Sequence, residues 1–409
     1  MINRYIHEAM TRHDHHSWVI VQQVLVRGIL ALKFLLAARL LGPEQIGLVG
    51  VALFSLAIVE SLSDTGLSQA IVQKAVIINS TEAGAVWTLL LCRGLALSAL
   101  LLLAAIPISS FFEIHGAAPL IAVAAVIPLL RNSINPGYFL VQRACNFRDI
   151  SIYESASALI DFSVTMLLLH LNFGAISLLL GNIANESLKL LISWLWFRTS
   201  LRPNFNWKGI HSLISFGKWI WSSSLLTLVL NQLDKVLIAK FLGPTEFGLY
   251  QVAARIAQLV VTDGPVALGQ YLYPNFSKRF HASPGAAQQY FKKIMLRLVP
   301  IVLIIAILLA VLAKQVIIVG LGMKWLSAAP VLRVMVMPMF LGAVIAVLVP
   351  YLRAIGKPRY VTEATLIQLI ILLVSAPFLL YFYGAIGMAC SLALAGSPAV
   401  YFMFRKSRR

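Results

Sequence analysis

The sequence predicts an all-α membrane protein with about twelve transmembrane helices, arranged as two lobes of six. Three observations lead to this fold class: a very apolar composition, a succession of long apolar runs, and a short motif that returns half a chain later. Hydrophobic residues make up 60% of the 409 residues and charged residues only 12%, and the mean hydropathy is +0.86. Soluble domains carry about 25% charged residues. This chain cannot cover a soluble globule with polar side chains, so we expect it to cross a bilayer.

Twelve apolar stretches are long enough to cross a hydrocarbon core of about 30 Å as helices. They lie near residues 18–40, 46–63, 85–107, 116–139, 151–171, 173–197, 213–241, 247–265, 294–313, 329–350, 362–383 and 384–404. Turn signals separate several of them, at Gly42-Pro43, Asn172-Phe173-Gly174, Gly243-Pro244 and Tyr383-Gly384. The longest connection, about 266–293, is polar and basic, and we expect it on the anionic inner surface of the membrane.

The distribution of basic residues predicts the orientation of these helices. The net charge is +18, from 33 Lys and Arg against 15 Asp and Glu. If the N-terminus lies in the cytoplasm, the connections on that side carry 22 of the 33 basic residues and those on the other side carry 4. Cytoplasmic loops of membrane proteins gather Lys and Arg. We therefore expect both termini inside, and most of the charge is explained without a nucleic-acid partner.

The sequence carries no signature of catalysis or of metal binding. It has no P-loop and no nucleophile motif. The three cysteines, Cys92, Cys145 and Cys390, have neither paired nor metal-ligand spacing, and the histidines near the N-terminus lack further ligands. We therefore expect a protein that is not an enzyme and that holds no cofactor or metal.

An internal repeat predicts the domain organisation. Leu41–Leu48 reads LGPEQIGL and returns 201 residues later, at Leu242–Leu249, as LGPTEFGL. Each copy lies between the first and second helix of a six-helix half. Because six is even, both halves enter the membrane in the same direction, and a pseudo-twofold axis along the membrane normal would relate them. We expect lobes at residues 1–200 and 201–409 that rock around a central cavity to give alternating access.

The same residues carry a family resemblance. Ala38–Gly47 resembles the first hairpin of bacterial polysaccharide flippases of the multidrug/oligosaccharidyl-lipid/polysaccharide exporter superfamily. Three further segments are similar to that family, namely Asp64–Lys74, Asn231–Tyr250 and Arg353–Pro358. The similarity spans most of the chain, and its motifs are mainly structural.

The resemblance implies transport of an undecaprenyl-pyrophosphate-linked oligosaccharide from the cytoplasmic to the periplasmic leaflet of the bacterial inner membrane, for O-antigen, capsule or exopolysaccharide. The implied partners are this lipid-linked oligosaccharide and membrane lipids, and they could include polysaccharide polymerase and export machinery. Two alternatives stay open: a drug or cation exporter of the same superfamily, and a membrane glycosyltransferase or polymerase of the same pathway. Basic groups at depth disfavour the first, because cationic drugs need acids, and short outside loops disfavour the second.

Five basic residues lie deep in predicted spans, where a charge is costly and marks a functional candidate. They are Arg27, Lys33, Arg93, Lys235 and Arg255. A pyrophosphate carries dense negative charge that guanidinium forks suit well. We expect these cations to line a cavity that accepts pyrophosphate and acidic sugars, with interhelical ion pairing as the alternative.

Two acids, Asp161 and Asp234, are the candidates for coupling transport to protons or Na⁺, because a buried carboxylate can change charge between states. The remaining acids in the spans are expected to balance the bases. Glu186 and Lys189, for example, are three residues apart on one helix, a spacing that permits an ion pair.

Overall fold

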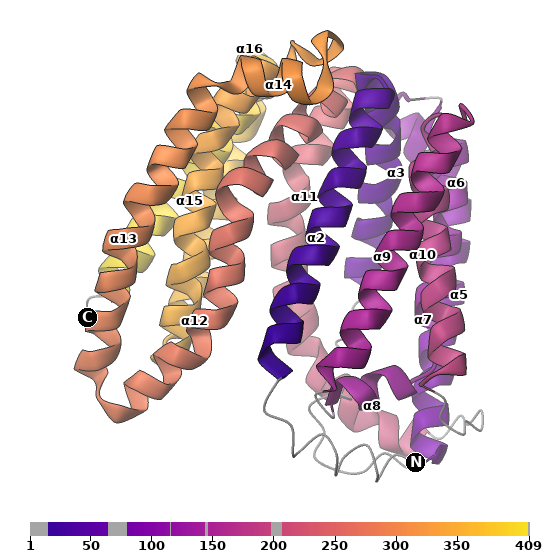
Figure 1. The fold of residues 1–409 in the computed structure, drawn as a ribbon, viewed down its shortest axis with the longest axis horizontal. Helices are drawn as coiled ribbons and strands as arrows, with labels where there is room; N and C mark the ends of the chain where they lie inside the picture. Colours follow the sequence, from indigo (N-terminus) through magenta and orange to yellow (C-terminus); the bar gives the residue numbers. More distant parts are fainter. Residues whose placement is uncertain (1–14, 64–79, 115, 144–145, 198–206, 408–409) are drawn as a thin grey trace. The chain divides into compact units, whose positions relative to one another are not determined.

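The computed structural model describes residues 15–63, 80–114, 116–143, 146–197 and 207–407 (Figure 1). Throughout these ranges the regular secondary structure is helical and no strand occurs. Six of the helices are long and apolar enough to cross a membrane. The predicted class, an all-α membrane protein, is confirmed, while the count of twelve crossings stays a prediction.

The chain forms two compact units. The first comprises Met1–Leu41 and Leu48–Leu228, and the second comprises Gly42–Gly47 and Val229–Arg409. The predicted lobe boundary at residues 200 and 201 lies outside the described residues. So does the family motif at Asp64–Lys74.

The first unit is a bundle of helices around α9. Its elements are α2 (His15–Leu40), α3 (Pro43–Leu62) from Leu48 on, α5 (Ser80–Phe112), α6 (Ala117–Ala124), α7 (Val126–Asn132), α8 (Gly137–Arg143), α9 (Phe147–His170), α10 (Ile176–Leu195) and the start of α11 (Trp207–Ala257). Helix α9 packs against α2 and α10, and α5 packs against α6 and α7. Helix α9 therefore lies between α2 and α10.

The helix expected over residues 116–139 is divided into α6 and α7. The break follows from Pro128, whose ring clashes with the carbonyl of the residue four positions earlier in a helix. That residue is Ala124, where α6 ends. A second short helix, α8, begins just after Pro136.

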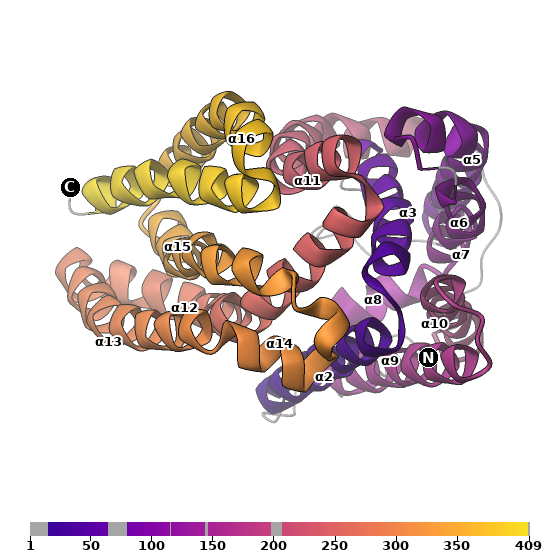
Figure 2. The same ribbon diagram turned by 90° about the horizontal axis from the view of Figure 1, so that it is seen from above.

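The second unit is organised around α15. Its elements are the rest of α11, a π-helix (Gln258–Thr262), α12 (Asp263–Ala282), α13 (Pro284–Val311), α14 (Ala313–Leu321), a short 3₁₀ helix (Met323–Trp325), α15 (Ala328–Ala354) and α16 (Pro358–Ser407). Helix α15 packs against α12, α13 and α16, and Figure 2 shows α12 and α13 side by side next to it. The rings of Phe291 and Tyr351 stack at 4.1 Å between centroids in its core.

The predicted turns lie where helices end or bend. The first falls between the end of α2 at Leu40 and the start of α3 at Pro43. Asn172 and Gly174 have positive φ between α9 and α10, Gly243 has φ +80° within α11, and Gly384 has φ +57° within α16. Glycine takes this conformation without a Cβ penalty. Gly243 therefore divides α11 into two helical segments, and Gly384 divides α16 in the same way.

The expectation of a polar surface connection over residues 266–293 is wrong. Helix α12 continues to Ala282 and α13 begins at Pro284, so only Ser283 interrupts the helices. The reason is a stripe of apolar residues four apart, Leu268, Leu272, Phe276 and Phe280, which packs into the core of the second unit. This spacing places the four side chains on one helix face.

The two copies of the repeated motif meet within the second unit. A Cβ at Gly47 would overlap the backbone carbonyl of Pro244, and a Cβ at Gly248 would overlap that of Pro43. Residues 43 and 244 are equivalent in the repeat, as are residues 47 and 248. The two contacts are therefore reciprocal, as in a local twofold relation, and each needs a residue without a side chain.

Candidate substrate-binding site

A buried ion pair joins α2 and α9 in the first unit. Lys33 Nζ lies 2.8 Å from Asp161 Oδ1 and 2.7 Å from Oδ2. Lys33 is 7% exposed and Asp161 is fully buried. The sequence predicts different roles for these two residues, substrate binding and ion coupling, and the structure makes them partners.

Helix α10 closes the site around Asp161. Thr165 Oγ1 donates to Asp161 Oδ1 at 3.3 Å. A Cβ at Gly181 would overlap Thr165 Oγ1 and would lie 2.6 Å from Asp161 Oδ1. The backbone of α10 therefore lies directly against the carboxylate, and this close approach depends on glycine.

The other two predicted cations of the first unit differ in their contacts. Arg93 on α5 donates from Nε to Ser63 Oγ at 3.0 Å and from Nη2 to the Glu60 carbonyl at 3.1 Å. It thereby satisfies a carbonyl near the end of α3, where the last carbonyls of a helix lack internal partners. Arg27 on α2 is half-buried and has neither a hydrogen bond nor an ion pair within the described part of the chain.

A charge network that the sequence reading missed is centred on Arg131. Its Nη1 lies 2.6 Å from Glu60 Oε2, and its Nη2 lies 2.8 Å from Glu186 Oε1. Arg131 is one of the 22 basic residues that the predicted topology assigns to the cytoplasmic connections. Glu60 and Glu186 are acids in predicted spans and require a nearby cation. This requirement is the signal in the sequence that could have indicated their pairing with Arg131.

The suggested pair of Glu186 with Lys189 does not form. Lys189 Nζ instead lies 2.7 Å from Glu154 Oε2 on α9, and Tyr138 donates to Glu154 Oε1 at 3.2 Å. Glu186 and Lys189 each find a partner on another helix, which the spacing along α10 cannot indicate. Lys33, Arg131 and Lys189 are thus each neutralised by a carboxylate on another helix of the first unit.

In the second unit Asp234 is buried and only partly satisfied. Tyr250 donates its hydroxyl to Asp234 Oδ2 at 2.7 Å. The other oxygen, Oδ1, is buried without a hydrogen-bond partner among the described residues. A buried carboxylate oxygen in this state can accept a proton or contact a cation, since leaving it unsatisfied is costly.

The two predicted cations of the second unit form no ion pair within the described residues. Lys235 Nζ donates to the Asn231 carbonyl at 2.9 Å and to Gln232 Oε1 at 3.0 Å, and both acceptors are neutral. Arg255 is half-buried, and no hydrogen bond or ion pair is recorded for it there. It lies one turn before the π-helix, an irregularity that is frequent at functional sites.

The described residues include no group of three or more His, Cys, Asp and Glu side chains that could hold a metal ion. The chemistry that they offer is electrostatic. Arg27, Lys235 and Arg255 present positive charge without an acidic partner in these ranges, which suits an anionic ligand.

The arrangement of helices is that of a known class of membrane transporter. The structure resembles a lipid II flippase, MurJ in an inward closed conformation, with a TM-score of 0.72 at 13% identity over 97% of this chain and 87% of that one. It also resembles an inward-facing multidrug resistance MATE transporter of the MOP superfamily, with a TM-score of 0.65 at 16% identity over 94% of each chain. These likenesses define the fold.

Residues 36–330 match the family described as polysaccharide biosynthesis protein, so the chain belongs to that family. The resemblance stated from the sequence motifs is confirmed, and the chain is a multi-pass membrane protein. It is 24% identical over 345 residues to the lipopolysaccharide biosynthesis protein WzxC of Escherichia coli (strain K12), covering 84% of this chain and 67% of the relative.

A second relative is the succinoglycan biosynthesis transport protein ExoT of Rhizobium meliloti (strain 1021). The identity is 25% over 333 residues, which cover 81% of this chain and 67% of the relative. The chain therefore spans about two thirds of the length of these curated relatives.

Proposed function

We propose that the protein is a flippase that moves an undecaprenyl-pyrophosphate-linked oligosaccharide from the cytoplasmic to the periplasmic leaflet by alternating access. Family membership supports a role in polysaccharide biosynthesis. The names of the relatives support transport and surface polysaccharide, and a solved structure with the same fold is a lipid II flippase. None of these relatives is named as an enzyme, and the proposal assigns no catalytic step to this chain.

The observation that carries the proposal is the presence of uncompensated positive charge in the apolar helices. Arg27 and Arg255 are half-buried and have no acidic partner in the described ranges, in contrast to Lys33. A charge in this position is expensive. A pyrophosphate and acidic sugars would offset this cost by charge-assisted hydrogen bonds. We propose Arg27 and Arg255, together with Lys235, as the groups that contact the substrate.

Because Lys33 is paired with Asp161, we assign different roles to the predicted site residues. In this proposal Lys33 and Arg93 hold helices in place while no substrate is bound. Asp161 then contributes to coupling only if the ion pair opens. Asp234 is the stronger candidate for coupling, because one of its oxygens is buried and unsatisfied among the described residues.

The proposed location is the bacterial inner membrane, with both termini in the cytoplasm and six-helix lobes at residues 1–200 and 201–409. The asymmetry of Lys and Arg supports this orientation. The half-length repeat supports the lobes. Polysaccharide polymerase and export machinery are proposed partners of the transported product.

The test replaces each proposed contact and measures transport in cells. In a strain that lacks the gene, Arg27→Gln or Arg255→Gln should lower surface polysaccharide and raise accumulated lipid-linked oligosaccharide. The expected effect is roughly ten- to hundredfold, because a charge-assisted hydrogen bond contributes about 1.5–3 kcal/mol and about 1.4 kcal/mol is tenfold.

The matched control is Arg333→Gln. Arg333 also lies on a helix of the second unit, but it is exposed, so its replacement should leave transport unchanged. Immunoblots of membranes confirm that all variants insert. Normal surface polysaccharide in both test variants would overturn the proposed site.

The second candidate function, a drug or cation exporter, is favoured by the likeness to the MATE fold. It predicts that cells gain resistance to hydrophobic cations and that no lipid-linked oligosaccharide accumulates after gene deletion. A glycosyltransferase or polymerase would instead change the length of the oligosaccharide that accumulates. Analysis of the accumulated lipid in the deletion strain separates the three.

A further inference from the structure

The second unit contains an apolar cavity of about 920 Å³ that the proposed transport does not use. It lies over α15, between α13 and the last part of α16, so all three walls belong to one unit. Cavities that bind drug-sized ligands measure about 300–1,000 Å³. This one is therefore large enough for a ligand of substantial size.

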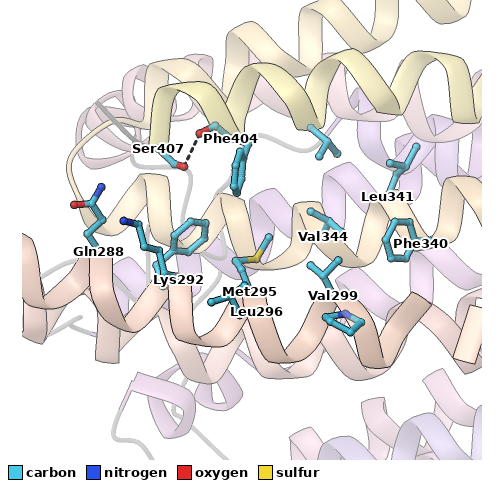
Figure 3. Close-up of a pocket in the computed structure, with 13 residues that line it drawn as sticks. Gln288, Lys292, Met295, Leu296, Val299, Phe340, Leu341, Val344, Phe404 and Ser407 are labelled. Carbon is cyan, nitrogen blue, oxygen red and sulfur yellow. Dashed lines mark hydrogen bonds between the residues drawn. The ribbon is translucent and has the colours of Figure 1, made fainter. Parts of the chain in front are cut away.

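The lining of the cavity is apolar along most of its length and polar at one end. Phe291, Met295, Val299, Phe340 and Val344 are among the apolar side chains that face it. Figure 3 shows Gln288, Lys292 and Ser407 at one end, and Leu341, Phe340 and Val299 toward the other. A ligand that fits would carry a polar head and an apolar tail.

The length of the cavity corresponds to one leaflet of a bilayer. It extends along α13 from Gln288 to Pro300. Twelve residues of α-helix rise about 18 Å. The hydrocarbon core of a bilayer is about 30 Å thick. One extended hydrocarbon chain would therefore cover most of the cavity from the polar end inward.

The charge at the polar end selects an anion. The exposed Lys292 has no hydrogen bond or ion pair among the described residues. The lining helices α13 and α15, and the part of α16 that follows Gly384, contain no Asp or Glu. Ser407 donates its hydroxyl to the Phe404 carbonyl at 2.7 Å, which leaves its oxygen able to accept. Nothing acidic on these elements opposes a phosphate beside Lys292.

The cavity is also open to the hydrocarbon side of α13. Leu296 lines it and is 77% exposed. Neighbouring turns of α13 present further exposed apolar side chains, including Ile304 at 65% and Ile307 at 56%. In a membrane protein such a surface faces lipid tails, so a lipid can enter from the bilayer without crossing water.

We infer that this cavity is a lipid-binding site for an amphipathic lipid phosphate, with the phosphate at Lys292 and one hydrocarbon chain along α13, α15 and α16. Two sources share this chemistry: an anionic bilayer phospholipid and a polyprenyl phosphate. The inference rests on the cavity alone and holds whatever the protein transports.

The test measures lipid binding to the purified full chain by native mass spectrometry in detergent, with phosphatidylglycerol, undecaprenyl phosphate and phosphatidylcholine as probes. Wild-type protein should retain both anionic lipids better than phosphatidylcholine. Lys292→Gln should weaken binding of the anionic lipids roughly tenfold, as expected for loss of one charge-assisted contact. The matched control is Lys293→Gln, because Lys293 is adjacent and exposed but does not line the cavity.

A second variant tests the apolar part. Val299→Trp fills the apolar end of the cavity and should abolish retention of all three probes. Lys292→Gln should keep the part of the binding that depends on the hydrocarbon chain. Tighter binding of undecaprenyl phosphate than of phosphatidylglycerol assigns the site to a polyprenyl lipid, and the reverse order assigns it to bilayer lipid. Unchanged retention in both variants, or occupation of the cavity by a second copy of the chain, would overturn the inference. The experiment measures lipid binding and not transport. Its result therefore does not depend on whether the proposed transport function is correct.

Discussion

At the scale of single residues, the charges in the helices fall into two groups. Lys33, Arg131 and Lys189 each lie within 2.8 Å of a carboxylate on another helix. Arg27 and Arg255 have no such partner in the described residues. In the first group the neighbouring carboxylate offsets the cost of placing each positive charge among the helices. We propose the second group as contacts for the substrate.

The Lys33–Asp161 pair leads to a prediction about stability. Asp161→Asn removes the partner of a buried ammonium group and should destabilise the protein by about 3–5 kcal/mol. The double variant Lys33→Met with Asp161→Asn removes the stranded charge and should recover part of this loss. Thermal unfolding of the purified protein in detergent measures both effects.

The comparison of single and double variants decides whether the two residues interact. Equal losses for Asp161→Asn and for the double variant would show that the stranded ammonium is not the cause. Lys293→Gln, on an exposed surface of the other unit, provides the control for removal of a lysine charge. It should leave the unfolding temperature unchanged.

At the scale of elements, glycine and proline determine where helices end and how closely they approach. Pro128 divides α6 from α7, and Gly243 and Gly384 divide α11 and α16. The breaks at Gly243 and Gly384 are among the predicted turns, because glycine permits positive φ. The break before Pro128 was not predicted, although proline is known to interrupt helices. The continuous helix through residues 263–282 was not predicted from the sequence. Polar residues on its outer face lower the average hydropathy of the segment, although an apolar stripe faces the core.

The reciprocal contact of the repeated turns leads to a second prediction. Gly47→Ala or Gly248→Ala should each destabilise the second unit by about 1–3 kcal/mol, as other overpacked sites do, because the new methyl group meets a backbone carbonyl. Thermal unfolding measures the loss. Once the first substitution has displaced one turn, the second substitution should cost less stability. The double variant should therefore lose less stability than the sum of the two single losses.

Gly42→Ala is the matched control for this prediction. Gly42 belongs to the same turn, its φ is not positive, and a Cβ there meets nothing within 4 Å. Its replacement should leave stability within about 0.5 kcal/mol of the wild type, as surface changes usually do. A loss for Gly42→Ala as large as that for Gly47→Ala would contradict the packing explanation.

At the scale of the whole molecule, the half-length repeat and the charge asymmetry together predict a duplicated transporter with both termini inside. The repeated turns then lie outside, and the turn between α12 and α13 lies inside. Glu44, Thr245 and Ser283 are exposed positions in these turns. They can therefore report the side of the membrane on which each turn lies.

Labelling with a membrane-impermeant thiol reagent tests this orientation in intact cells, after the three native cysteines have been replaced by serine. Glu44→Cys and Thr245→Cys should both be labelled, since the repeat places them on the same side. Ser283→Cys should be labelled only after the cells are permeabilised. Labelling of Ser283→Cys in intact cells would contradict the topology, and labelling of only one of Glu44→Cys and Thr245→Cys would contradict the parallel arrangement of the repeats.

The sequence by itself determined the class of protein, most helix ends and the family. Composition, apolar length and the motif of glycine and proline depend on residues close together in the chain, so they can be read without a structure. Which charges pair, and which side chains line the cavity at Lys292, became visible only in the folded chain. Lys33 and Asp161 are 128 positions apart, and the cavity at Lys292 needs three helices from different parts of the chain. Such contacts depend on how helices pack, and a single sequence does not show its packing partners.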